Sequence, residues 1–314
     1  MELLGKYGKE DLAFLYIAKY KGEIVEFVES LQPPIPREKK WVLIISTMYG
    51  CPIKCLMCDA GEYYHGKIPK EGMLKEIDYM IRARFPDGKV PINKFKIQFA
   101  RMGEPALNEE VLDVLKELPK RYEAPGLMPC ISTVAPRAAE KFFEELKTIK
   151  DEFYPNGNFQ LQFSIHSTDE NNRRKMMALN IWTLDEIRDY GEKWYKKGDR
   201  KITLNFAVEN SSNIDPNVIV DHFDPEKYLI KLTPINPTKK AQVNDLQSAI
   251  TEENSNCFPL AQEFRKRGFE TLISIGEWEE NQIGSNCGQF ATKYQDGKIT
   301  IKENYTTTNY AIKD

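Results

Sequence analysis

Three cysteines stand close together in the segment GCPIKCLMCDAG, which covers residues 50–61. Cys51, Cys55 and Cys58 are separated by three and then two residues, and no fourth cysteine lies nearby in the sequence. A structural zinc site is normally closed by four ligands, and a [4Fe–4S] cluster is normally held by four thiolates. Three thiols at this spacing therefore predict a metal centre with one coordination position left open for a reactant.

The elements that must position this loop alternate between β-rich runs and amphipathic stretches. We predict strands at 41–47, 95–100, 128–133, 159–166, 201–209, 228–234 and 269–275, and helices at 70–84, 108–118, 136–149, about 167–197 and 247–267. This alternation is typical of parallel βα units with right-handed crossovers. Seven strands are too few for a closed eight-stranded barrel. The sequence therefore predicts an α/β fold, an open (β/α)6-type partial barrel with one extra late strand and a C-terminal loop.

The chain is expected to have three parts. Residues 1–40 are predicted to form a short amphipathic helix, roughly over 10–20, and a proline-rich connector; residues 41–292 form the core, and residues 293–314 form a polar tail. A composition of 41% hydrophobic residues is that of an ordinary globular protein. The net charge of −3 provides no general attraction for nucleic acid. The sequence has neither a signal peptide nor a long apolar stretch, which predicts a cytoplasmic protein without membrane association.

Polar residues follow the predicted strands, and in parallel α/β sheets chemistry gathers at this end of the strands. These residues are the cysteine loop, Gly103, Glu104, Ser132, His166 and Asn236. Glu104 stands on a glycine–proline turn, where a carboxylate could bind a cationic amino group. A lone Gly-Glu-Pro is more often only a turn that begins a helix.

The cysteine spacing directly after a first strand resembles that of the radical S-adenosylmethionine (radical SAM) superfamily. In that superfamily the three cysteines hold three irons of a [4Fe–4S] cluster, and S-adenosylmethionine chelates the fourth iron, which would explain the open position. The resemblance implies both of these cofactors, a 5′-deoxyadenosyl radical, and a low-potential electron donor of the flavodoxin or ferredoxin type. The competing interpretation of the cysteines is a zinc-binding interaction module without turnover.

Further motifs resemble, in order, those of the RlmN/Cfr family of RNA adenosine methyltransferases. They are GEPALN (103–108), CISTVAP (130–136), FSIHSTDENNRRKMM (163–177), LTPINP (232–237) and NCGQFA (286–291). With the cysteine motif they cover about residues 41–292. The resemblance implies that the cofactor is bound by Gly103, Glu104, Ser132, Ser164, Ile165, His166 and Asn236.

The resemblance also implies roles for two residues outside the cofactor pocket. In this family the cysteine that matches Cys287 is methylated by one cofactor molecule, and a second generates the carbon radical that adds to the adenine ring. Glu26, in EIVEFVES, is similar to a family glutamate that acts as a base, although a solvated surface carboxylate is an equally good interpretation. The alternative role for Cys287 is that of a hydrogen donor to a substrate radical in non-methylating chemistry.

Two departures from the family pattern bear on mechanism and substrate. The family's resolving cysteine lies seven positions before the first cluster cysteine, and Ile44 stands there (51 − 7 = 44); Cys130, or less readily Cys257, could replace it. About forty residues stand in place of the family's helical N-terminal domain, and GEWEENQIG (276–284) is acidic where a phosphate backbone would prefer basic residues. The expected substrate is therefore RNA adenosine by resemblance, or a smaller metabolite or peptide.

Overall fold

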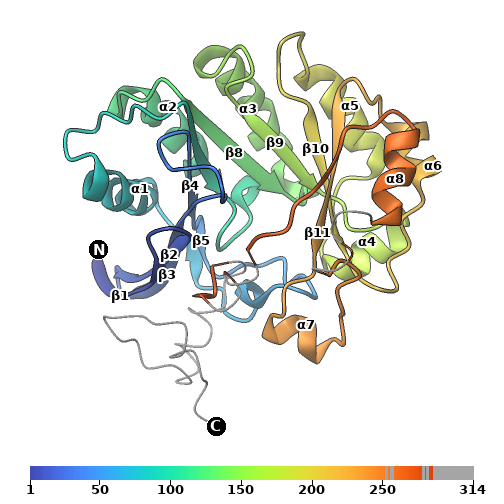
Figure 1. Ribbon diagram of the computed structural model, residues 1–314, viewed down its shortest axis with the longest axis horizontal. Coiled ribbons are helices and arrows are strands. Elements are labelled where there is room, and N and C mark those ends of the chain that lie inside the picture. Colours follow the sequence, from blue (N-terminus) through green and yellow to red (C-terminus); the bar gives the residue numbers. More distant parts are fainter. Residues whose placement is uncertain (252–253, 255–257, 278–279, 281–282, 286–314) are drawn as a thin grey trace. The chain divides into compact units, whose positions relative to one another are not determined.

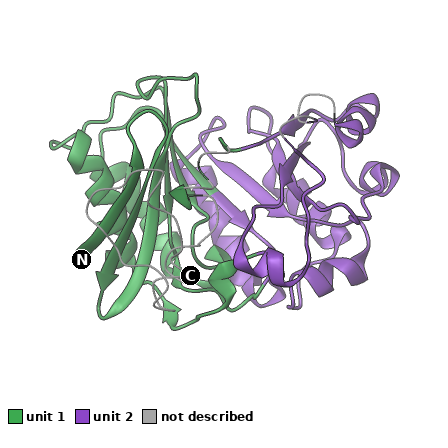
Figure 2. Cartoon of the chain, turned by 60° about the horizontal axis from the view of Figure 1, so that its bottom comes forward, with its two compact units in different colours: residues 1–54, 58–130, 276–314 green, residues 55–57, 131–275 purple. Residues whose placement is uncertain are grey.

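The computed structural model describes residues 1–251, 254, 258–277, 280 and 283–285. Figure 1 shows an α/β chain in which strands and helices alternate from residue 40 onward. The chain divides into two compact units, coloured separately in Figure 2. The first unit contains residues 1–54, 58–130 and 276–314, and the second contains residues 55–57 and 131–275.

The first unit is built on strands that are antiparallel at the N-terminus and parallel after residue 40. Its elements are β1 (Glu2–Lys9), β2 (Ala13–Tyr20), β3 (Glu23–Ser30), β4 (Lys40–Ile45), the short β5 (Met48–Tyr49) and β6 (Gly66–Lys67), α1 (Lys70–Arg84), β7 (Lys94–Phe99) and α2 (Glu110–Arg121). Strands β1 to β4 pair antiparallel in sequence order, and β4 pairs parallel with β7. Strand β8 (Leu127–Thr133) follows β7 in the sheet, and its last three residues belong to the second unit.

The second unit continues with parallel strands and their connecting helices. Its elements are α3 (Glu140–Phe153), β9 (Gln160–Ser164), α4 (Glu170–Met176), α5 (Leu184–Trp194), β10 (Ile202–Val208), α6 (Pro216–His222), β11 (Tyr228–Pro234), α7 (Lys239–Val243), α8 (Pro259–Lys266) and β12 (Thr271–Ile273). Strands β9 to β12 pair in parallel and in sequence order. Aromatic rings of Phe143 and Trp182, 4.4 Å apart between centroids, pack near Phe163 of β9 and form part of the core on the helix-covered face.

All seven strands predicted after residue 40 are present, and the described sheet is open, with β1 and β12 at its two edges. The predicted open, mostly parallel α/β sheet is therefore confirmed. The predicted helix at 247–267 is too long, because α8 begins only at Pro259. No helix among the described residues is long and apolar enough to cross a membrane.

The predicted helix over residues 10–20 is wrong, because strand β2 occupies most of this stretch. The run AFLYIAKY is apolar at consecutive positions, and periodicity alone cannot assign such a run to a helix or a strand. Both faces of β2 are covered: the ring of Tyr16 packs edge-on against Tyr79 of α1, while Ile17 lies in an apolar cluster on the opposite face. Residues 1–40 are therefore not a separate part but share the sheet of the first unit.

Candidate active site

The cysteine loop leaves strand β4 and folds back at two glycines. Gly50 has a φ of +84°, and a Cβ atom there would lie 1.2 Å from the carbonyl oxygen of Tyr63. A Cβ atom on Gly61 would lie 2.7 Å from the Cα atom of Lys54. Because no other residue type tolerates both the positive φ and the close approach, Gly50 in particular is required for this loop to close.

Of the three cysteines of the loop, Cys51 is buried, and Cys55 and Cys58 are half-buried. Burial raises the pKa of the Cys51 thiol to about 12, and the charge of Glu104 acts in the same direction, while backbone N–H groups of the loop oppose them. In the described part of the chain, no three His, Cys, Asp or Glu side chains are gathered closely enough to hold a metal ion as they stand. The donor set still fits an iron–sulfur cluster, because one short loop supplies three soft thiolate ligands.

The middle of the cysteine loop, residues 55–57, is held by the second unit. The backbone N–H of Leu56 donates to the carbonyl of Met176 at 3.0 Å, and the hydroxyl of Thr238 donates to the carbonyl of Met57 at 2.8 Å. The Met57 side chain packs against a small apolar cluster that includes Ala207. These contacts fix the backbone at Cys55 independently of the glycine turns at the ends of the loop.

The GEPALN turn follows strand β7 and rests against the start of the cysteine loop. Gly103 has a φ of +103°, and a Cβ atom there would lie 2.6 Å from the Cβ atom of Met48. The side-chain amide of the fully buried Asn108 donates to the carbonyls of Thr47 and Ile68, each at 2.8 Å. The glycine and the asparagine of this motif therefore hold the turn in place.

Glu104 is the acidic residue of this turn. Its side chain is buried, and Oε1 accepts a hydrogen bond from the backbone N–H of Ala106 at 3.0 Å, which caps the short 3₁₀ helix Pro105–Leu107. Its charge acts on the Cys51 thiol. The structure thus brings a predicted cofactor-binding carboxylate close to a predicted cluster ligand, both at the carboxyl ends of neighbouring parallel strands.

A buried hydrogen-bond network joins the ends of β4 and β7 to β3. The hydroxyl of Ser46 donates to the carbonyl of Glu26 at 2.5 Å and accepts from the backbone N–H of Met102 at 3.2 Å. The backbone N–H of Ser46 donates to Oε2 of Glu76 on α1 at 2.9 Å. Burial raises the pKa of Glu76 well above its usual range, because a carboxylate loses its hydration in the core.

Glu26 lies in the middle of β3 and is fully buried, so the interpretation of a solvated surface carboxylate is wrong. Its Oε1 lies 2.7 Å from Nη2 of Arg101, whose side chain is 1% exposed. The same guanidinium donates to the carbonyl of Gly284 at 2.6 Å and to the carbonyl of Ser285. Sequence motifs did not indicate Arg101, although a charged residue directly after an apolar strand was visible beside the glycine–glutamate turn.

In the second unit, Ser132 on β8 and Ser164 on β9 are half-buried, as predicted site residues should be. The amide of Gln162 donates to the hydroxyl of Ser132 at 3.2 Å, and Nζ of Lys231 donates to Oε1 of Gln162 at 3.4 Å. Gln162 and Ser164 share one face of β9, because successive side chains of a strand alternate. The prediction missed Gln162 and Lys231, although the alternation in FQLQFS indicated a polar face.

His166 follows β9 with a φ of +64°, which is uncommon for a residue other than glycine. Its Nδ1 accepts a hydrogen bond from the backbone N–H of Ala207 at 3.0 Å. Burial lowers the pKa of His166 to about 4, and the charge of Arg173 acts in the same direction. The imidazole is therefore neutral at pH 7, with its proton on Nε2. Ile165 is fully buried, and Asn236 is half-buried after β11.

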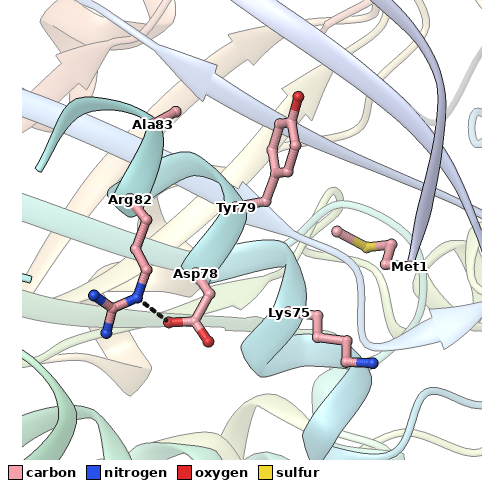
Figure 3. Close-up of a pocket in the computed structure, with 6 residues that line it drawn as sticks. All are labelled: Met1, Lys75, Asp78, Tyr79, Arg82 and Ala83. Atoms are coloured by element: carbon pink, nitrogen blue, oxygen red, sulfur yellow. Dashed lines mark ion pairs between the residues drawn. The ribbon is translucent and has the colours of Figure 1, made fainter. Parts of the chain in front are cut away.

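The remaining predicted cysteines fall at different places. Cys130 is buried in β8, where its Sγ lies 3.5 Å from the carbonyl oxygen of Met128. Cys287 and Cys257 lie outside the described residues. A hollow of about 480 Å³ beside α1 contains none of the predicted site residues (Figure 3). It is lined by Met1, Lys75, Asp78, Tyr79, Arg82 and Ala83.

Comparison with known proteins agrees with the motifs. A probable dual-specificity RNA methyltransferase RlmN from Thermus thermophilus is 25% identical over 277 residues, which covers 82% of this chain and 70% of that protein. The protein of the same description from Flavobacterium psychrophilum is 25% identical over 268 residues, covering 82% of this chain and 72% of the relative. The predicted resemblance to the RlmN/Cfr-like radical SAM methyltransferases is confirmed. No family model matches the chain.

A solved structure supports the fold. The crystal structure of a radical SAM methyltransferase from Sphaerobacter thermophilus aligns with a TM-score of 0.70, covering 91% of this chain and 80% of that one at 16% identity. The RlmN-like chain therefore has the open α/β architecture of a radical SAM methyltransferase. Such enzymes use a [4Fe–4S] cluster and S-adenosylmethionine, and the spacing of Cys51, Cys55 and Cys58 agrees with both cofactors.

Proposed function

We propose that this protein is a radical SAM enzyme that methylates a carbon atom of an adenosine in RNA, with Cys287 as the methyl carrier. The observation that carries the proposal is the placement of the buried Glu104 carboxylate close to the Cys51 thiol. The similarity to RNA methyltransferases over 82% of the chain supports the substrate class.

The acidic segment 276–284 was expected to disfavour a phosphate backbone, but one of its carboxylates does not face solvent. Glu280 is buried, and its Oε2 accepts a hydrogen bond from the hydroxyl of Ser285 at 2.9 Å. This carboxylate therefore serves the local structure and adds little repulsion at a surface, which weakens the objection to an RNA substrate.

The roles of the chain's own residues follow from their chemistry. Cys51, Cys55 and Cys58 would hold the cluster, which with bound S-adenosylmethionine supplies the reducing electron for a 5′-deoxyadenosyl radical. The electron would come from a flavodoxin or ferredoxin type of donor. Glu104 would compensate the charge of the cofactor's ammonium group, and the neutral His166 can only donate from Nε2.

Cys287 would act twice on the carbon that is transferred. Its thiolate first attacks the methyl group of S-adenosylmethionine: a sulfur–carbon bond forms, the bond from methyl to the sulfonium breaks, and S-adenosylhomocysteine leaves. The methyl carbon would then lose a hydrogen atom to the 5′-deoxyadenosyl radical and add to the substrate carbon. Release of the product would break the sulfur–carbon bond at Cys287 while a second thiol, for which Cys130 is our candidate, forms a disulfide with Cys287. The proton of the substrate carbon would pass to the transferred carbon, and the unpaired electron would return to the cluster.

Anaerobic incubation of the reconstituted protein with S-adenosylmethionine, a reductant and total RNA tests the proposal. We expect S-adenosylhomocysteine, 5′-deoxyadenosine, a peptide with methylated Cys287, and methyladenosine in the RNA. The Cys287→Ala variant should lose the methyl group on the protein and in the RNA. Full methylation of RNA by this variant would overturn the carrier role and favour Cys287 as a hydrogen donor or a bystander.

A further inference from the structure

The last described residues before Cys287 are fastened to the first unit by three contacts of different kinds. Ile283 is fully buried in an apolar cluster with side chains of β1 to β3. Arg101 donates to the carbonyls of Gly284 and Ser285. The hydroxyl of Ser285 donates to Glu280, and the backbone N–H groups of Gly284 and Ser285 both donate to the carbonyl of Glu280, at 2.9 and 3.0 Å.

The position of Glu26 explains why the guanidinium stands where it does. Side chains of β3 alternate between faces, so Glu26 shares a face with Ile24 and Val28, which belong to or pack against the cluster that holds Ile283. A carboxylate in an apolar cluster is costly unless it is paired. Arg101 is the cation that pairs with Glu26. The same guanidinium also donates hydrogen bonds to two carbonyl groups of the C-terminal segment.

We propose that Arg101, held in place by Glu26, is a positioning residue that fixes the start of the segment carrying Cys287 for methyl acceptance. The proposal rests on the proposed function of Cys287. At most about 7 Å of extended chain can separate the Cα atoms of Ser285 and Cys287, so a fixed Ser285 limits how far from it the thiol can lie. Attack on a methyl group requires sulfur and carbon in line at near contact, and a misplacement of about 1 Å can cost about a hundredfold in rate.

A second ion pair on the same strand provides a matched control. Glu29 on the opposite face of β3 accepts two hydrogen bonds from the guanidinium of Arg84, at 2.6 and 2.7 Å, and is itself 2% exposed. This pair joins β3 to α1, and the guanidinium of Arg84 donates to Glu10 and Glu29. Arg84→Met therefore removes another arginine–carboxylate pair of β3, one in which the arginine is partly exposed.

The test combines a structural and a chemical measurement on the full chain. In hydrogen exchange, the amides of Gly284 and Ser285 should exchange at least about tenfold faster in Arg101→Met than in the unsubstituted protein or in Arg84→Met. In a single-turnover assay with S-adenosylmethionine alone, methylation of Cys287 should slow by about ten- to a hundredfold in Arg101→Met. Arg101→Lys, which keeps a charge and can donate to a carbonyl, should recover part of that rate.

The outcomes separate this proposal from the proposed function. Absence of methyl on Cys287 in the unsubstituted protein would overturn both. A methylated unsubstituted protein with an equal rate in Arg101→Met would overturn the positioning role alone. Equal losses in Arg101→Met and Arg84→Met would also overturn it, because the effect would then follow from general destabilisation. Formation of 5′-deoxyadenosine, which does not involve Cys287, should stay unchanged in Arg101→Met and confirms that the cluster and cofactor are loaded.

Discussion

Ile44 packs against the same apolar cluster of the first unit that contains the fully buried Ile283. Ile44 stands where the resembling family has its resolving cysteine, and Ile283 lies four residues before Cys287. The position of the missing thiol and a residue four positions before Cys287 therefore meet in one apolar cluster. Under the proposed mechanism, Ile44 cannot resolve the adduct, and Cys130 is our candidate for that step.

The first prediction restores the missing thiol. Ile44→Cys should speed release of methylated RNA, because the new thiol lies against the segment that leads to Cys287 and can form a disulfide with it as the adduct breaks. Product formed per enzyme over time measures the release, and non-reducing peptide mass spectrometry detects the disulfide. Val42→Cys, on the same strand but outside the cluster, is the control. If neither a disulfide nor faster release follows from Ile44→Cys, then Cys287 does not carry a covalent adduct.

The second prediction concerns the cluster. Cys55→Ala should abolish formation of 5′-deoxyadenosine and lower the iron content of the anaerobically reconstituted protein, because each thiolate anchors one iron. Lys54→Ala, which changes an exposed side chain of the same loop, should retain both. Iron and sulfide analysis with the visible absorption spectrum measures the loss. Zinc in place of iron and sulfide in the unsubstituted protein, or an unchanged iron content in Cys55→Ala, would contradict the cluster assignment.

A third prediction separates the two roles of Glu104. The amide of Glu104→Gln can still accept the hydrogen bond from Ala106, so the turn should keep its cap while the negative charge is lost. Loss of a charged hydrogen bond costs about 1.5–3 kcal/mol, so affinity for S-adenosylmethionine should fall by about ten- to a hundredfold. Equilibrium dialysis measures this, with the exposed Glu109→Gln as control. Equal affinities in the two variants would leave Glu104 only its structural role.

The strands after residue 40 were predictable because each is a short apolar run followed by a helix at a regular interval. Ser132, His166 and Asn236 lie within two residues of the last residue of β8, β9 and β11, respectively. The N-terminal strands were not predictable in this way, because β2 is covered on both faces and its apolar run has no period. Tertiary pairing, and not local sequence, decides such a segment.

For a different reason, the contacts of the C-terminal segment could not be predicted from the sequence. Glu26 lies in β3 and Arg101 follows β7, two strands that are separated in the sheet by β4, and no local pattern connects the two residues. The family resemblance indicated Glu26 but gave no partner for it. A buried ion pair of this kind forms only when the sheet is assembled. The three-dimensional structure also reveals that Arg101 donates to the carbonyls of Gly284 and Ser285, shortly before Cys287 in the sequence.

The fourth prediction is a pH dependence that comes from His166. Burial lowers the pKa of His166 from its ordinary value of 6.5 to about 4, so between these pH values the unfolded chain binds a proton that the folded chain does not. Stability from this group is therefore fully present above pH 6.5 and is lost as pH falls towards 4, by up to about 3 kcal/mol. Urea denaturation at pH 7 and pH 5 measures it. His166→Asn, which tolerates a positive φ, should lose this part of the pH dependence; the same slope in both proteins would contradict the assignment.

The last prediction decides between two roles for Glu26. A base in the substrate step would leave methylation of Cys287 at its normal rate in Glu26→Gln and would abolish only the transfer to RNA. A residue that acts through Arg101 would instead slow methylation of Cys287, because the guanidinium loses its anchor. We expect the second result, since the carboxylate is fully buried and its ion-pair partner binds the segment before Cys287.

The double variant Glu26→Gln with Arg101→Met makes this comparison quantitative. Residues that act as one unit have non-additive effects, so the double variant should methylate Cys287 no more slowly than the slower single variant. Breaking a buried pair costs about 3–5 kcal/mol, so each protein is assayed at a temperature where circular dichroism shows it folded. If the rate reductions of the two single variants multiply in the double variant, then Glu26 acts independently of Arg101. A normal rate of Cys287 methylation in Glu26→Gln would instead favour the role of Glu26 as a base.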